Sequence, residues 1–209
     1  LTPTIQVGGS GLGPLPPVLG SCIIDGTTQP ALGGGSTMVE IDGSLAGAGA
    51  NGLEVRGGDS VVRGMVINRF SDVGIVISGT GPPGDGGHRI EGCFIGTDIT
   101  GAAGLGNGGD GIFIERGTPN NLIGGPDAEH RNVISDNGGN GITIQNVGFL
   151  PFASLNRIQR NLIGTDVTGA VDLGNSAHGV HVLVTEGGAG TPMETEIGGG
   201  EDFRNLISG

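Results

Sequence analysis

Short segments in which apolar residues alternate with polar or small ones recur along the whole chain, and several of them open with glycine. The five clearest have the form Gly-apolar-x-apolar and lie at residues 52–55, 74–77, 111–114, 141–144 and 179–182. A period of two, built largely from isoleucine and valine, predicts strands whose successive side chains point to opposite faces. Helices are disfavoured, because glycine or proline interrupts nearly every window long enough for three turns.

Each of these segments is followed by two further short apolar segments before the next one begins. The second segment is centred on Val62, Ile90, Ile123, Ile158 and Ile197 in turn. The third covers residues 66–67, 94–95, 133–134, 162–163 and 206–207. Three short strands per repeat indicate a chain that winds into a solenoid, with one coil per repeat.

The fold class we predict is therefore all-β, a right-handed parallel β-helix of about six coils, each with three short strands. Residues 1–209 are expected to form a single domain. Within it, residues 1–50 form an N-terminal partial coil or cap and residues 51–209 form five regular coils. Since the chain begins without methionine at Leu1 and stops directly after a predicted strand, we expect it to be a fragment of a longer solenoid.

Stacking of the coils makes specific predictions, because equivalent residues then lie ~4.8 Å apart along the axis. One interior column should contain only isoleucine: Ile67, Ile95, Ile134, Ile163 and Ile207. Asn132, Asn161 and Asn205 each open a third strand, so we expect them to form a ladder of side-chain hydrogen bonds at a tight corner. Asparagine also tolerates the left-handed backbone that such corners often require.

Two of the connections between coils are near copies of each other and carry candidate metal ligands. Asp98 and Asp166 lie at equivalent places in the segments Ile-Gly-Thr-Asp-x-Thr-Gly at residues 95–101 and 163–169. A carboxylate, a hydroxyl and turned carbonyl groups are ligands that calcium accepts, so each loop is a candidate calcium site. The alternative is an Asx-turn, in which the carboxylate accepts hydrogen bonds from amides of its own loop.

Composition narrows the classes of function. The 48 glycines and 11 prolines would normally indicate disorder, but the periodic isoleucines and valines outweigh them. The net charge is −12 and all nine cationic side chains are arginine, so no basic surface for nucleic acid or anionic membranes is expected. Among the arginines, we expect Arg63 to pair with Glu91 and Arg157 with Glu196 across neighbouring strands.

The two cysteines, Cys22 and Cys93, are predicted to be free, buried thiols. They fall near equivalent strand starts about two coils apart, and two strand spacings exceed the reach of a disulfide. The sequence shows no signal peptide, no transmembrane stretch and no Cys/His cluster with zinc spacing.

Several of these segments resemble right-handed parallel β-helix repeats of large bacterial secreted and surface proteins. They are Cys22 to Pro30, the two Ile-Gly-Thr-Asp-x-Thr-Gly segments, and the Arg-Asn-apolar-Ile-Ser segments at 131–135 and 204–208. The resemblance covers nearly the whole chain from about residue 20. It implies an extracellular or cell-surface location and a structural or adhesive role, with polysaccharide or other surface proteins as partners.

The wider β-helix architecture also includes polysaccharide lyases and glycoside hydrolases, which gives the alternative function. The residues that best fit such a site are Asp110, Glu115, His178 and His181, since carboxylates and imidazoles transfer protons in these reactions. Against it, the Asn-Thr-Asp, Asp-Asp, Gly-His-Gly and Arg-Ile-Lys motifs of polygalacturonases are all absent. A carbohydrate platform would also favour tryptophan and tyrosine, and the chain has neither.

We therefore expect a structural or adhesive module without catalytic activity of its own, and a polysaccharide-acting or carbohydrate-binding β-helix as the alternative. A solenoid whose last coil is open presents unpaired strand edges. For that reason we also expect head-to-tail self-association.

Overall fold

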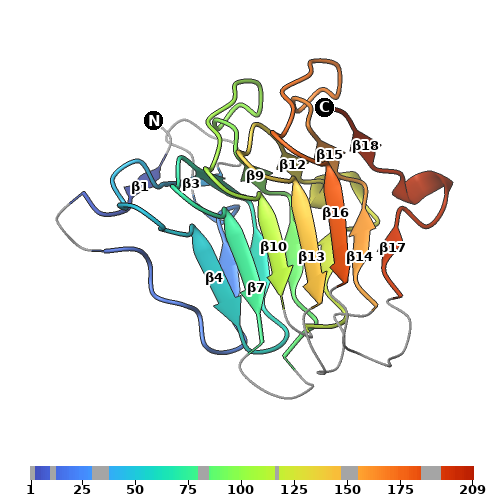
Figure 1. Ribbon diagram of the computed structural model, residues 1–209, viewed down its shortest axis with the longest axis horizontal. Coiled ribbons are helices and arrows are strands. Elements are labelled where there is room, and N and C mark those ends of the chain that lie inside the picture. Colours follow the sequence, from blue (N-terminus) through green and yellow to red (C-terminus); the bar gives the residue numbers. More distant parts are fainter. Residues whose placement is uncertain are drawn as a thin grey trace.

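The computed structural model describes residues 3–9, 13–29, 38–79, 85–115, 118–146, 155–184 and 194–209. Within these ranges the chain forms three parallel sheets of short strands (Figure 1). Sheet A contains β1 (Thr4–Gln6), β3 (Val39–Asp42), β6 (Met65–Asn68), β9 (Phe94–Ile95), β12 (Val133–Ile134), β15 (Leu162–Ile163) and β18 (Leu206–Ile207). Sheet B contains β4 (Leu53–Arg56), β7 (Ile75–Ser78), β10 (Ile112–Glu115), β13 (Ile142–Asn146) and β16 (Val180–Val184). Sheet C contains β2 (Ile23–Asp25), β5 (Val61–Arg63), β8 (Arg89–Glu91), β11 (Leu122–Gly124), β14 (Arg157–Gln159) and β17 (Glu196–Ile197).

The chain visits sheets B, C and A in turn, so each strand pairs with the equivalent strand of the coil before and the coil after. This is the arrangement of a parallel β-helix, as the sequence predicts. The register also agrees with the prediction. Along sheet A, each isoleucine of the predicted column is the register partner of the next, in the order Ile67, Ile95, Ile134, Ile163 and Ile207. Two three-residue 3-10 helices, η1 (Ala128–His130) and η2 (Glu201–Phe203), interrupt the connections.

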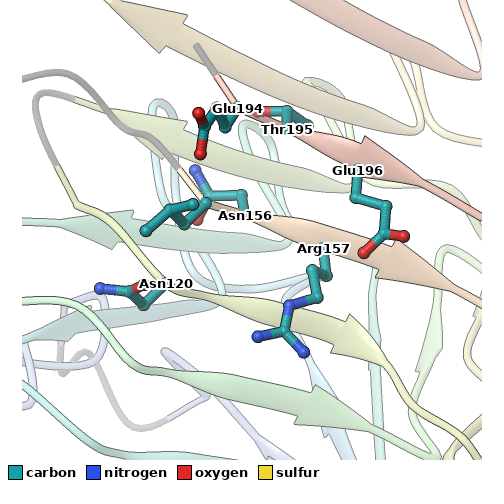
Figure 2. Close-up of a pocket in the computed structure, with 7 residues that line it drawn as sticks. Asn120, Asn156, Arg157, Glu194, Thr195 and Glu196 are labelled. Atoms are coloured by element: carbon teal, nitrogen blue, oxygen red, sulfur yellow. The ribbon is translucent and has the colours of Figure 1, made fainter. Parts of the chain in front are cut away.

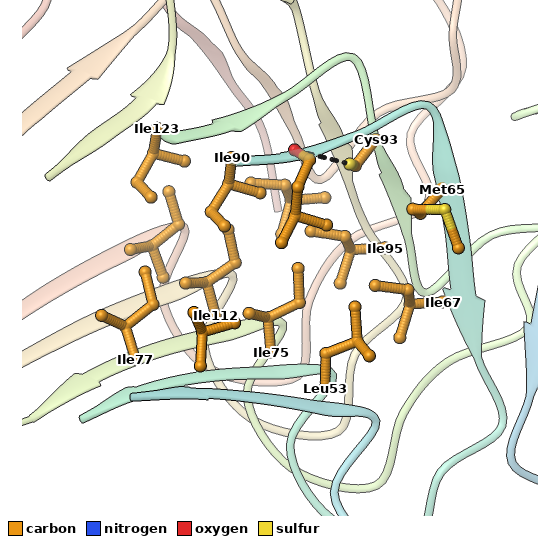
Figure 3. Packing of buried hydrophobic residues seen from close by; sticks show 14 of the residues in the cluster. Leu53, Met65, Ile67, Ile75, Ile77, Ile90, Cys93, Ile95, Ile112 and Ile123 are labelled. Carbon is orange, nitrogen blue, oxygen red and sulfur yellow. Dashed lines mark hydrogen bonds between the residues drawn. The ribbon is translucent and has the colours of Figure 1, made fainter. Parts of the chain in front are cut away.

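The core is a narrow column of aliphatic side chains enclosed by the three sheets (Figure 3). Ile95, Ile134 and Ile163 are fully buried in it, and so are the facing residues Ile112 and Ile142 of sheet B. Figure 3 shows Ile67, Ile75, Ile95 and Ile112 directed toward one another from different sheets. Burial of this continuous apolar column offsets the conformational entropy that the many glycines lose on folding.

The glycines that open the sheet B strands are required by close packing. A Cβ on Gly111 would lie 2.6 Å from Cγ2 of Ile134 and 2.7 Å from the carbonyl oxygen of Gly141. Gly141 has the same surroundings one coil further along, with Ile163 at 2.7 Å and Gly179 at 2.6 Å. The recurring glycine therefore allows the sheet B strand to approach the isoleucine column of sheet A.

Asparagine ladders join the coils at the corners. The Nδ2 of Asn132 donates to Oδ1 of Asn161 at 2.9 Å, and the Nδ2 of Asn161 donates to Oδ1 of Asn205 at 3.0 Å. This confirms the predicted ladder, although its members do not have the left-handed backbone that the sequence analysis invoked. In the middle coil it is the preceding residue, Arg160, that has a positive φ of 60°.

Two further ladders, which the sequence analysis did not predict, run along the other corners. Asn107, Asn137 and Asn175 are linked by side-chain bonds of 3.0 Å each. Asn121 donates to Asn156 at 2.9 Å on the corner that precedes sheet C. Buried polar side chains at all three corners thus bond one coil to the next.

The two near-copy loops fold back over the outer face of sheet A. A Cβ on Gly101 would lie 2.9 Å from both the ring of Phe94 and the Cβ of Val167, and the amide of Val167 donates to the carbonyl of Gly101 at 2.8 Å. The second loop lies on Leu162 and Leu206 in the same way. Where the loops cover it, from Phe94 to Leu206, the outward-facing column of sheet A is apolar, and Leu162 is buried although it points away from the core.

The structure corrects two predictions about pairing. Both cysteines are free, as predicted, but Cys22 precedes sheet C and is only half-buried, whereas Cys93 precedes sheet A and is fully buried. Burial raises the pKa of the Cys93 thiol to about 12, so this thiol is unreactive at neutral pH.

The predicted partner of Arg63 was also wrong. Its guanidinium bonds to Asp25, its other neighbour along sheet C, at 2.6 Å, and Glu91 instead accepts from Arg89 at 2.6 Å. Arg157 and Glu196 are register partners as expected, yet they form no ion pair within the described residues. No helix within the described ranges is long and apolar enough to cross a membrane.

Candidate functional site

Three of the four residues predicted for a catalytic site lie at or next to the corner that leads into sheet B. Asp110 and His178 occupy equivalent positions directly before the glycines that open β10 and β16, two coils apart. Asn140 holds the same position in the coil between them. His181 lies on the outer face of β16, and its ring centroid is 5.4 Å from that of His178, with the rings tilted by 54°.

Hydrogen bonds through Asn140 connect these residues. Oδ1 of Asp110 accepts the amide of Asn140 at 2.6 Å, and Oδ1 of Asn140 accepts the amide of His178 at 3.0 Å. The side-chain nitrogen of Asn140 also donates to the hydroxyl of Thr143 at 3.0 Å. The carboxylate of Asp110 therefore acts as a structural acceptor between coils, which is the role that asparagine has at the other corners.

Glu115 lies apart from this group. It ends strand β10, whereas Asp110 precedes that strand, so five residues of extended chain, about 16 Å, separate the two. A glycosidase pair requires carboxylates ~5–9.5 Å apart. Asp110 and Glu115 therefore do not form such a pair.

Asp98 and Asp166, the predicted calcium ligands, have their carboxylates turned into their own loops. Oδ1 of Asp98 accepts from the hydroxyl of Thr100 at 2.9 Å and from the amides of Ala102 and Ala103 at 3.1 Å each. Burial alone would raise the pKa of Asp98, but these bonds outweigh it and lower the pKa below its usual value. The contacts are those of the Asx-turn alternative, and calcium binding stays a prediction.

A different group of side chains could share a cation. The ligand atoms of Asp127, Glu129 and His130, at the turn η1, all lie within 4.8 Å of one another in the described part of the chain. The Nδ1 of His130 is 3.5 Å from Oδ2 of Asp127. The two acidic side chains are exposed, and such exposed acidic groups are common without a metal ion.

An open pocket of about 410 Å³ lies where the chain enters the last described strands of sheet C (Figure 2). It is lined by Asn120, Leu155, Asn156, Arg157, Glu194, Thr195 and Glu196. Figure 2 shows these side chains projecting from consecutive coils, with Arg157 and Glu196 on neighbouring strands. The pocket thus presents donors, acceptors and one apolar side chain side by side.

Sequence reasoning missed this pocket because its residues lie in three separate coils. One signal was available in the register. Arg89-Ile90-Glu91 and Arg157-Ile158-Gln159 are equivalent, and only the first contains the carboxylate that can pair with the arginine. Because Gln159 stands where the earlier coil has Glu91, the sequence predicts that Arg157 lacks the carboxylate partner that Arg89 has.

Comparison with known proteins does not assign the chain to a family. No protein-family model matches it, no curated protein matches it, and no solved structure matches it.

Proposed function

We propose that this chain is a structural or adhesive β-helix module of an extracellular or cell-surface protein, without catalytic activity of its own. The observation that carries the proposal is the use of its buried polar side chains. Asn132, Asn137 and Asn161 are fully buried, and each bonds to a neighbouring coil. A repeat held together in this way is suited to act as a stiff, extended support.

The outer faces support the same proposal. The outward column of sheet B contains Glu54, Val76, Phe113, Thr143 and His181, which are of unlike chemistry. A catalytic groove would instead gather several acidic or basic side chains from neighbouring coils. The bacterial adhesin-like type, implied by the resemblance of the repeats, is part of this proposal.

An activity assay tests the absence of catalysis. The protein is incubated with a panel of neutral and uronic-acid polysaccharides, and new reducing ends and unsaturated ends are measured. We expect no products above a heat-inactivated control. Cleavage that is lost in His178→Ala or Glu115→Ala would overturn the proposal in favour of a polysaccharide-acting enzyme.

The partners we propose for the module are polysaccharides and other surface proteins. A further proposed partner is a second copy of the module itself. Ile197, Leu206 and Ile207 belong to the last described coil and are 44–47% exposed, whereas their register partners one coil earlier, Ile158, Leu162 and Ile163, are buried. A coil of a second copy stacked on this face would bury these side chains and pair the strand edges. Light scattering over a range of concentrations tests this, since a mass that stays that of the monomer contradicts self-association.

A further inference from the structure

In a repeat protein, each structural position has counterparts in the other coils, so a position that departs from its counterparts calls for a local reason. Three such departures coincide in the pocket lined by Leu155, Arg157, Glu194, Thr195 and Glu196. None of the three contributes to the stacking of the coils. Each can be compared with the equivalent residue of another coil.

The first departure is the arginine. Arg63 and Arg89 lie in the same sheet and each bonds a carboxylate at 2.6 Å. Arg157 has no ion pair or side-chain hydrogen bond to any described residue, although Glu196 is its register partner. Its guanidinium is exposed and lines the pocket (Figure 2). It therefore offers a full set of donors to a ligand.

The second departure is a strained leucine. The residue that precedes each buried corner side chain has a left-handed backbone, and the types found there are Asp59, Gly87 and Asn120, which tolerate it. Leu155 occupies the next position with φ of 61° and is 47% exposed. A leucine is unfavourable in this conformation, and this one adds little to the core. Its apolar side chain instead forms a wall of the pocket.

The third departure is an unsatisfied hydroxyl. The corner column runs through Ser60, His88, Asn121 and Asn156, and each of them bonds to the neighbouring coil. Thr195 follows in this column, and its Oγ1 is buried and bonds to none of the residues that the structure describes. A buried hydroxyl without a partner is unfavourable unless a ligand or water completes it.

We propose that this pocket binds a neutral saccharide. Sugar hydroxyls donate and accept at once, so they suit a pocket whose lining contains both the carboxylates of Glu194 and Glu196 and the guanidinium of Arg157. The C–H face of a sugar ring fits the side chain of Leu155. Two carboxylates against one cation, on a chain of net charge −12, disfavour an anionic ligand.

This inference rests on the proposed adhesive function, because it names the ligand through which the module would attach. It also goes beyond that function by placing the contact at one corner of the helix. With neither tryptophan nor tyrosine to stack on the sugar, affinity for one chain should be modest, in the region of ~1 mM.

The test uses hexasaccharides of β-linked glucan, xylan, mannan and chitin, with oligogalacturonate as the anionic comparison. Binding is measured by calorimetry and by amide chemical-shift changes in isotope-labelled protein. We expect shifts at the pocket residues with at least one neutral sugar. Arg157→Gln and Glu196→Gln should each weaken binding about tenfold or more, because a charged hydrogen-bonding group is lost.

Matched controls carry the same substitutions elsewhere on the surface. Arg131→Gln and Glu201→Gln alter exposed residues that do not line the pocket, and binding should change less than twofold, as expected for surface positions outside the site. Leu155→Asn copies the residue type of the previous coil. It should weaken binding while leaving the melting temperature unchanged or raising it, because strain is relieved.

Each other outcome overturns the assignment. If no neutral sugar binds at ~10 mM, the pocket is not a saccharide site. If the wild type binds and the Arg157 and Glu196 variants bind equally well, the attachment lies elsewhere and the adhesive function survives. Stronger binding of oligogalacturonate contradicts the neutral ligand, and a lower melting temperature for Leu155→Asn makes the leucine structural.

Discussion

The side-chain nitrogen of Asn132 donates to the side-chain oxygen of Asn161 in the next coil at 2.9 Å, and both residues are fully buried. The same nitrogen of Asn132 donates to the carbonyl of Ile90 at 2.8 Å, and its Oδ1 accepts the amide of Cys93 at 2.8 Å. One side chain therefore satisfies backbone groups of its corner and also joins two coils. Because an unpaired buried polar group is unfavourable, this arrangement fixes the register of one coil on the next.

Replacement of a central ladder residue should destabilise the protein strongly. Asn161→Ala removes bonds to Asn132, Asn205 and the carbonyl of Ile123 and leaves buried groups unpaired. We expect a loss of about 2–3 kcal/mol in the free energy of unfolding, measured by urea denaturation. Asn205→Ala, at the half-buried end of the ladder, is the control and should lose about 1 kcal/mol. Equal effects of the two would contradict a role for the ladder.

Truncation in the isoleucine column should create a cavity. Ile134 is fully buried between Ile95 and Ile163, so Ile134→Ala is expected to destabilise by about 2–5 kcal/mol. Val171→Ala provides the comparison, since Val171 is 52% exposed and the change should stay within about 0.5 kcal/mol. Urea denaturation of both variants checks the ranking. A small effect at Ile134 would show that the column is not tightly packed.

Stability should fall on mild acidification because of His88. This side chain is fully buried and accepts the amide of Ser60 at Nδ1, and burial lowers its pKa below 6.5. The unfolded chain therefore binds the proton more readily, so stability present at neutral pH is lost as the pH falls below about 6.5 toward the pKa of the folded state. Melting temperatures between pH 7.5 and 5 measure this loss.

His88→Asn is the matched variant for that prediction. This substitution gives position 88 the side-chain amide that Asn121 and Asn156 have at the equivalent corner of the following coils. The pH dependence between 7.5 and 5 should diminish in this variant. An unchanged dependence would assign the titration to another group.

The role of Asp98 can be separated from calcium binding. Asp98→Ala removes the acceptor for Thr100, Ala102 and Ala103, and we expect a melting temperature lower by roughly 2–4 °C in the presence of a chelator. Calcium titration of the wild type by calorimetry is the companion measurement. If the variant differs from the wild type only when calcium is present, the carboxylate is a metal ligand. If the variant melts at a lower temperature than the wild type when calcium has been removed by a chelator, the carboxylate acts in an Asx-turn.

The coil could be predicted from the pattern of residues alone. Alternating isoleucine and valine can bury one face only in stacked strands, and the repeat fixed which residues share a column, so the pairing of Ile95, Ile134 and Ile163 was predictable. The ladder through Asn132 and Asn161 followed from the same register. The ladder through Asn107 and Asn137 was not predicted, because these residues lie in connections of unequal length.

Which polar side chains bond to one another across coils became clear from the three-dimensional structure. Asp110 and Glu115 are close in sequence, yet an extended strand places them at opposite ends. Arg157 and Glu196 are neighbours as predicted, but they form no ion pair within the described residues. Two further features could not be predicted from the sequence: the exposure of Leu155, and the ion pair of Arg63 with Asp25. Strand periodicity specifies which face a side chain takes, but its contacts depend on the length and path of the loops that set one coil upon the next.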